Sequence, residues 1–174
     1  MDLVTEPDYW AIKERIQLIL KKSANDQIWQ EGNQATGFQK IEVGLPSNNV
    51  MGGLTYPACY ITNADDMETD QVRGPASAGS HGMSQHVFKV KFLLIEQKED
   101  GQECEKSLDT IQKNLKEVLK ANYSLRHPDS ITDATTALAT GIIGNIVVSK
   151  FSAEYDGKPL EVRLITIPYW LHTS

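Results

Sequence analysis

The sequence lacks the features by which membrane proteins and disulfide-bonded proteins are usually recognised. Its two cysteines, Cys59 and Cys104, stand in no metal-binding or redox spacing, which indicates a reducing compartment and two small, buried apolar side chains. The longest apolar run, residues 92–95, is far shorter than the roughly 20 residues that span a bilayer. No basic region precedes an apolar stretch at the N-terminus, so we expect synthesis in the cytosol and no membrane contact.

The sequence also lacks an excess of positive charge. Seventeen lysines and arginines stand against 23 aspartates and glutamates, a net charge of −6. This balance argues against a protein whose main task is to grip phosphate backbones. A surface of this sign repels DNA, which suits a conduit for DNA as well as an ordinary soluble protein.

No motif for binding a phosphate group or a metal ion occurs in the chain. Both the glycine-rich loop of P-loop proteins and that of dinucleotide-binding folds are missing. The acidic run 65–70 departs from the calcium-binding EF-hand loop, which needs an acidic residue at position three and glycine at position six. Met67 and Asp70 stand there instead. We therefore predict no metal ion and no cofactor.

Signs of nucleophilic or acid–base catalysis are equally sparse. Residues 74–79 have the spacing Gly-x-x-Ser-x-Gly, which differs from a nucleophile elbow, and no strand-to-helix turn is predicted around Ser77. His81 and His86 lie in or beside an irregular segment, and we predict no catalytic carboxylate partner for His127 or His172. We predict that the chain is not an enzyme and assign no catalytic residue.

The patterns that are present predict a single α+β domain over residues 1–174, with two main helices packed on one face of a mostly antiparallel, mixed sheet. Helical spacing of apolar residues predicts a helix over residues 6–22 and a second helix that follows residues 99–101 and carries a stripe from Cys104 to Leu119. About five strands are predicted, over residues 38–43, 56–62, 85–97, 146–155 and 160–171. The segment 124–145 shows no clear period and is predicted to be a loop with a short helical turn.

The strand 85–97 has the clearest alternation in the chain. His86, Phe88 and the even-numbered apolar residues after them fall on one face, with Lys89 and Lys91 on the other. Both faces become apolar toward its end, so we expect a helix on one side and another element, such as a neighbouring subunit, on the other. The Asp156-Gly157 pair predicts a tight hairpin between the last two strands.

Residues 63–86 form the longest stretch without a pattern. Twenty-four residues far exceed the usual connection of about five, and long connections are generally functional or disordered. We interpret the segment as a flexible arm between two paired strands that becomes ordered against a partner, with an unimportant disordered insertion as the alternative. Its candidate interface residues are Asp65, Asp66, Glu68, Asp70, Arg73, His81 and His86.

This order of elements resembles the tail terminator and tail-completion proteins of tailed bacteriophages. Three features carry the resemblance: a short N-terminal helix well before the first strand, a Pro-Ala step into the apolar strand at residues 56–61, and the Leu108-x-x-Ile111-x-x-x-Leu115 helix before a C-terminal hairpin. The resemblance implies a virion protein at the head-proximal end of the tail, assembled in the host cytoplasm. Such proteins form a ring, usually a hexamer, that caps the tail tube, ends its growth and joins it to the head connector, with DNA passing through the lumen.

Other interpretations remain open at this point. Related folds also serve as neck proteins and as tube subunits, so the fold does not fix the position along the tail. A different class is a small enzyme or ligand-binding domain with residues 63–86 as a lid over a pocket containing Lys89, Lys91 and His86. A third is an interaction adaptor outside any virus.

Overall fold

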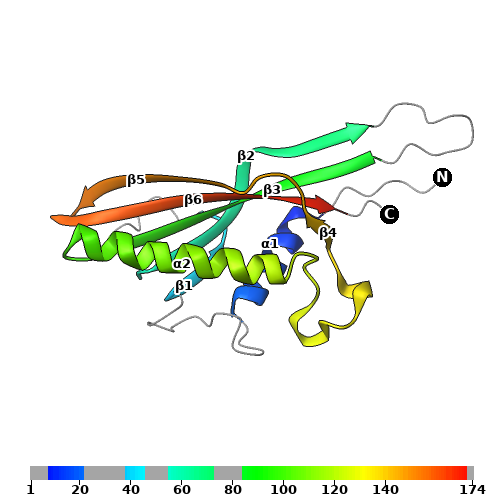
Figure 1. Cartoon of the computed structure of the whole chain (residues 1–174), viewed down its shortest axis with the longest axis horizontal. Helices are drawn as coiled ribbons and strands as arrows, with labels where there is room; N and C mark the ends of the chain where they lie inside the picture. The colour runs from blue at the N-terminus through cyan, green and yellow to red at the C-terminus, as the bar shows by residue number, and fades with distance from the viewer. Residues whose placement is uncertain (1–7, 22–37, 46–54, 73–83, 172–174) are drawn as a thin grey trace, which may run out of the picture.

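The computed structural model describes residues 8–21, 38–45, 55–72 and 84–171. It is an α+β domain in which two helices lie against a six-stranded sheet (Figure 1). The helices are α1 (Tyr9–Lys21) and α2 (Gly101–Ala121). The strands are β1 (Lys40–Val43), β2 (Ala58–Val72), β3 (Ser84–Gln97), β4 (Ala139–Ile142), β5 (Val147–Tyr155) and β6 (Lys158–Leu171). None of the described helices is long and apolar enough to cross a membrane.

The sheet is mixed but mainly antiparallel. Its order is β1-β2-β3-β6-β4, and β5 also pairs with β6. Among the described strands, β1 and β2 alone run parallel to each other. β4 pairs with β6 at residues 169–171 and β5 pairs with it at residues 158–166, so β5 and β4 follow one another along the same edge of β6.

The two helices and one face of the sheet enclose the main core. The face of β3 predicted from its alternation is confirmed, because His86, Phe88, Val90, Phe92 and Leu94 are all buried. The apolar stripe of α2 is confirmed too, since every one of its predicted members is buried: Cys104, Leu108, Ile111, Leu115, Val118 and Leu119. Both cysteines are free and buried, as predicted.

Local sequence signals explain where the described elements begin and turn. Asp100 caps α2, because its carboxylate accepts a hydrogen bond of 3.0 Å from the backbone N–H of Gln102. The predicted hairpin between β5 and β6 turns at Asp156 and Gly157, whose φ angles are 54° and 74°. Positive φ at both central residues is what a two-residue type I′ turn requires, and Asp-Gly adopts it readily.

The opposite face of the sheet carries a second, smaller apolar cluster. It comprises Ala58, Tyr60, Ile95, Leu160 and Val162. We expected the second apolar face near the end of β3 to be covered by another element, such as a neighbouring subunit. Within the chain itself, Ile95 on this face is only 4% exposed, whereas Leu93 and Leu164 are half-buried. The strand is therefore covered on both sides near its end without a neighbouring subunit.

Two predictions about irregular segments are wrong. Residues 63–72 and 84–86 are not patternless, because they belong to β2 and β3, and Glu68 to Val72 pair with β3, whereas the middle of the predicted arm, residues 73–83, lies outside the described residues. Residues 124–145 contain two short 3-10 helices and the strand β4, which raises the strand number from about five to six. In both places pairing with an existing strand organises residues that have no strong preference of their own.

Candidate functional site: the hairpin arm and the free sheet edge

The first candidate surface is the hairpin formed by residues 63–72 of β2 and 84–90 of β3, which we call the arm. A bulge separates it from the rest of the sheet: Asn63 pairs with Val90 and Glu68 pairs with Phe88, so four residues of β2 face Lys89 alone. Bulges bend a strand and increase its twist. In Figure 1 β2 bends at this point, and the arm lies at the opposite end of the molecule from the turn between β5 and β6, while residues 86–90 of β3 stay paired with β6.

The predicted acidic residues of the arm lie next to lysines of β3. The Nζ atom of Lys89 is 2.6 Å from Oδ2 of Asp66, and that of Lys91 is 3.7 Å from Oδ1 of Asp65. The hydrogen bond from Lys89 lowers the pKa of the Asp66 carboxyl. Asp65 and Asp66 are exposed, so these pairs orient the side chains of the bulge more than they stabilise the fold.

His86 anchors the base of the arm to α1. Its ring is buried, hydrogen-bonded to the Tyr9 hydroxyl, and its Nε2 atom lies 3.8 Å from Oε1 of Glu68. The Tyr9 ring also stacks on Phe88 at 4.3 Å between centroids. His86 is thus a packing residue of the core face, as its place in the alternating strand indicates, and not part of an irregular segment.

The structure brings together four of the seven predicted interface residues. Asp65, Asp66 and Glu68 lie on the bulge or just after it, and His86 lies beside Glu68. The backbone of Asp70 pairs with His86 in the ladder between β2 and β3. Arg73 and His81 lie outside the described residues.

The arrangement around the arm differs from a lidded active site. Lys89 and Lys91 point to the face of the sheet that carries Asp65 and Asp66, whereas His86 points to the helix-covered face. The three residues named for a lidded pocket therefore do not converge. Within the described ranges, no three His, Cys, Asp or Glu side chains gather closely enough to hold a metal ion.

The second candidate surface, the outer edge of β5, was missed by sequence reasoning. All positions of β5 except Tyr155 are exposed. Three large apolar side chains on it face solvent: Val147, Val148 and Phe151. A clue was available, since the predicted strand 146–155 carries apolar residues on both faces, but only the strand order shows that it lies at an edge.

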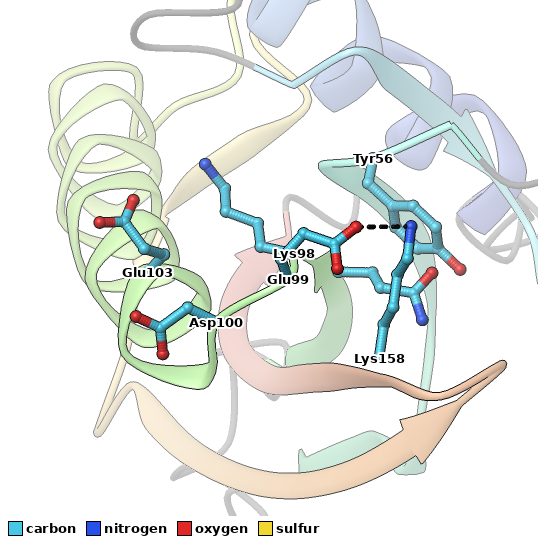
Figure 2. A pocket seen from close by; sticks show the side chains of 7 residues that line it. Tyr56, Lys98, Glu99, Asp100, Glu103 and Lys158 are labelled. Carbon is cyan, nitrogen blue, oxygen red and sulfur yellow. Dashed lines mark ion pairs between the residues drawn. The ribbon is translucent and has the colours of Figure 1, made fainter.

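An open pocket of about 530 Å³ lies beside the turn from β3 into α2. It is lined by Tyr56, Gln97, Lys98, Glu99, Asp100, Glu103 and Lys158 (Figure 2). The Nζ atom of Lys158 lies 2.9 Å from Oε1 of Glu99, and Figure 2 shows this pair next to Tyr56 while Asp100 and Glu103 sit apart at the start of the helix. Partial burial raises the pKa of the Tyr56 hydroxyl. Lys158 and Glu99 thus neutralise each other at the wall of the pocket next to Tyr56.

A group of polar side chains is buried between α2 and the sheet. Arg163 donates to Oε1 of Gln112 at 2.7 Å and lies 2.8 Å from Oδ1 of Asp109. Glu96 and Glu161 lie next to each other on β3 and β6, and both are buried. Buried charges in such a group are held by specific hydrogen bonds, so the group fixes how α2 lies on the sheet.

Comparison with known proteins adds little to this geometry. No protein-family model matches the chain, and no curated protein matches its sequence. Among solved structures, the chain is similar to one in a structure titled "Virion of native gene transfer agent (GTA) particle", with 10% sequence identity and a TM-score of 0.27, over 76% of this chain and 78% of that chain. A similarity of this size does not support a functional conclusion.

Proposed function

We propose that the chain is a structural protein of a phage-like virion that forms a ring on the end of the tail tube. The ring ends tube growth and provides the surface to which the head is joined. The sequence resemblance supports this proposal, and the observation that carries it is the arm, a hairpin whose β2 strand is displaced at a bulge and bears exposed carboxylates. Within the described residues β1 pairs only with residues 58–61 of β2, so the outer edge of the arm is unpaired and can contact a neighbour.

The geometry of the arm fits a contact between copies. The Lys89–Asp66 and Lys91–Asp65 pairs leave the carboxylates of Asp65 and Asp66 on the outer surface. Contacts in which one face of a subunit binds a different face of the next generate a ring when the rotation closes. In this ring the arm of each copy lies against the next copy or against the tail-tube protein.

The charge of the chain is compatible with a position around DNA. A net charge of −6 per copy gives a ring that repels the phosphate backbone where its acidic residues face the lumen. DNA then passes without specific binding, and no cofactor takes part in the process.

Two other positions along the tail, the neck and the tube itself, use the same contacts between copies and are distinguished by what the ring binds. A ligand-binding or enzymatic role is less favoured, because Lys89 and Lys91 lie on the opposite face of the sheet from His86.

Electron microscopy of the purified full-length chain, alone and mixed with tail tubes, tests the proposal. We expect rings with a central hole, of about sixfold symmetry, and tubes of defined length capped at one end. Rings that bind only the head connector would assign the chain to the neck. A chain that stays monomeric at high concentration and in the presence of tubes would refute the proposal.

A further inference from the structure

Among the described residues, the edge strand β5 has only the charged side chains of Lys150 and Glu154 to protect it from pairing. Natural sheets also shield edges with bulges, prolines, short strands or covering loops. β5 instead extends over nine residues, pairs with β6 on one side and bears exposed Val147, Val148 and Phe151. Within the described part of the chain, no strand pairs with its other side. We propose that β5 pairs antiparallel with β5 of a second copy, across a two-fold axis at Ser152.

The hairpin turn determines which backbone groups of β5 face outward. A two-residue turn at Asp156 and Gly157 makes Tyr155 and Lys158 a hydrogen-bonded pair. From this pair onward, the N–H and C=O groups of successive residues point alternately toward one neighbouring strand and the other. Those of the even-numbered residues of β6 therefore point toward β5 and β4. The hydrogen bond of 3.0 Å from the N–H of Ile143 to the carbonyl of Pro168 agrees with that phase.

It follows that every second residue of β5 turns its N–H and C=O groups away from β6. These residues are Val148, Lys150, Ser152 and Glu154. An antiparallel partner must hydrogen-bond to these four residues, which restricts the possible registers. A two-fold axis at Ser152 satisfies the restriction, because it pairs even-numbered residues with even-numbered residues.

Charge selects this register among the few that remain. An axis at Ser152 sets Lys150 opposite the partner's Glu154, and Glu154 opposite the partner's Lys150. An axis at Lys150 would place two lysines directly opposite each other, which destabilises a strand pair. An axis at Phe151 would leave Glu154 opposite a valine. The side chain of Lys150 is 55% exposed even with its pairing to Glu105 at 2.9 Å, so a second carboxylate can approach it.

The other face of the strand supplies apolar contact in the same register. Phe151 is 52% exposed and lies on the face opposite the helices, across from Val162. An axis at Ser152 places Phe151 opposite the partner's Ala153, where a small side chain leaves room for an aromatic ring. Reciprocal charge pairs and this fit, both within one strand, favour a second copy of the chain over an unrelated protein.

This pairing goes beyond the ring and does not depend on it. The arm and the turn of the β5–β6 hairpin lie at opposite ends of the molecule (Figure 1). Loss of the arm therefore leaves the two-fold pair in place, and loss of the β5 contact leaves the arm intact.

Sedimentation velocity of the full-length chain over a wide concentration range tests the pairing. We expect the wild-type assembly to double in mass as concentration rises, from monomer to dimer where no rings form and from single to paired rings where they do. Lys150→Glu and Glu154→Lys should each weaken dimerisation about tenfold or more, because each creates two like-charged pairs. The double variant restores opposite charges and should restore the dimer, while Glu117→Lys on the exposed face of α2 serves as a charge-reversal control.

Three results would overturn the proposal. They are a wild-type chain without dimers at any concentration, a self-association that the single reversals do not weaken, and a double variant as weak as the singles. Either of the last two would show that the copies associate through a different register, strand or surface.

A second pair of variants tests the backbone without altering charge. Ser152→Pro removes the N–H at the centre of the proposed interface, a group that does not bond to β6, so the fold should persist and the dimer should be lost. Ser152→Ala controls for the hydroxyl, which donates to Oε1 of Glu161 at 2.5 Å. A dimer that survives Ser152→Pro in a chain with a normal unfolding transition would contradict the pairing. The charge-reversal variants decide the matter if the proline variant does not fold.

Discussion

Glu96 on β3 and Glu161 on β6 lie directly opposite each other on neighbouring strands, and both are buried beneath α2. Each carboxylate accepts one hydroxyl hydrogen bond: Ser107 donates to Glu96 at 2.7 Å and Ser152 donates to Glu161 at 2.5 Å. Burial raises the pKa of Glu96, an effect that the Ser107 hydrogen bond only partly offsets.

We therefore predict that Glu96→Gln stabilises the protein at neutral pH. Because the folded pKa of Glu96 is raised, protonation favours the folded state; this stabilisation is complete below the unfolded pKa and is lost as pH rises through the folded pKa. Glutamine keeps the shape and removes the charge, so we expect a gain of about 1 kcal/mol at pH 7 that disappears in acid. Thermal unfolding at pH 7 and pH 4 measures it. Glu117→Gln is the exposed control, and an equal gain at both pH values would contradict the explanation.

Removal of the Asp109 carboxylate should cost more than an exposed position normally does. The Arg163 side chain is 6% exposed whereas that of Asp109 is 65% exposed, so Asp109→Ala leaves a buried guanidinium with Gln112 as its remaining side-chain partner. We expect a loss of about 2 kcal/mol in the free energy of unfolding. In an Arg163→Met background the same change should cost less than about 0.5 kcal/mol, because no buried charge is left behind. Chemical denaturation of the four chains measures the difference, and equal costs in both backgrounds would disprove the coupling.

Loss of the Tyr9 hydroxyl should loosen the base of the arm. Tyr9→Phe keeps the ring stack on Phe88 and removes the hydrogen bond to buried His86. We expect a destabilisation of about 1 kcal/mol and faster hydrogen exchange at the backbone amides of the arm. Tyr123→Phe, at an exposed tyrosine, should change neither quantity. Unchanged exchange in Tyr9→Phe would show that the arm is held by other contacts.

Shortening of the arm should separate folding from assembly. Gln71 pairs with Gln85 and, by the alternation of β3, this pair is hydrogen-bonded, so the thirteen residues between them can be replaced by Asn-Gly, which closes a two-residue hairpin. We expect an unchanged thermal unfolding transition and the loss of rings and of tube capping. Asp156→Asn, which keeps a favourable type I′ turn at the other hairpin, is the control. Normal assembly of the shortened chain would count against a role for the arm.

Part of the fold follows from residues close together in sequence. The stripe from Cys104 to Leu119 defines the buried face of α2, and the alternation after His86 defines the core face of β3. The Asp156-Gly157 turn was predictable for the same reason, because a positive φ at both positions depends on the local backbone alone. The candidate site was predictable only as a location, since the acidic residues from Asp65 onward were identified without their partners.

The sequence by itself determined periodic elements and tight turns. In both, the conformation depends on residues close together in the chain, at the fixed spacing of a helix, strand or turn. Only the tertiary structure decided that β2 continues to Val72, because polar residues with weak strand preference, from Glu68 onward, pair there with β3. It alone also decided that β5 is an edge, that Lys89 meets Asp66 and that Glu96 meets Glu161. These relationships depend on strand order and register, which join residues far apart in the chain and leave no local pattern.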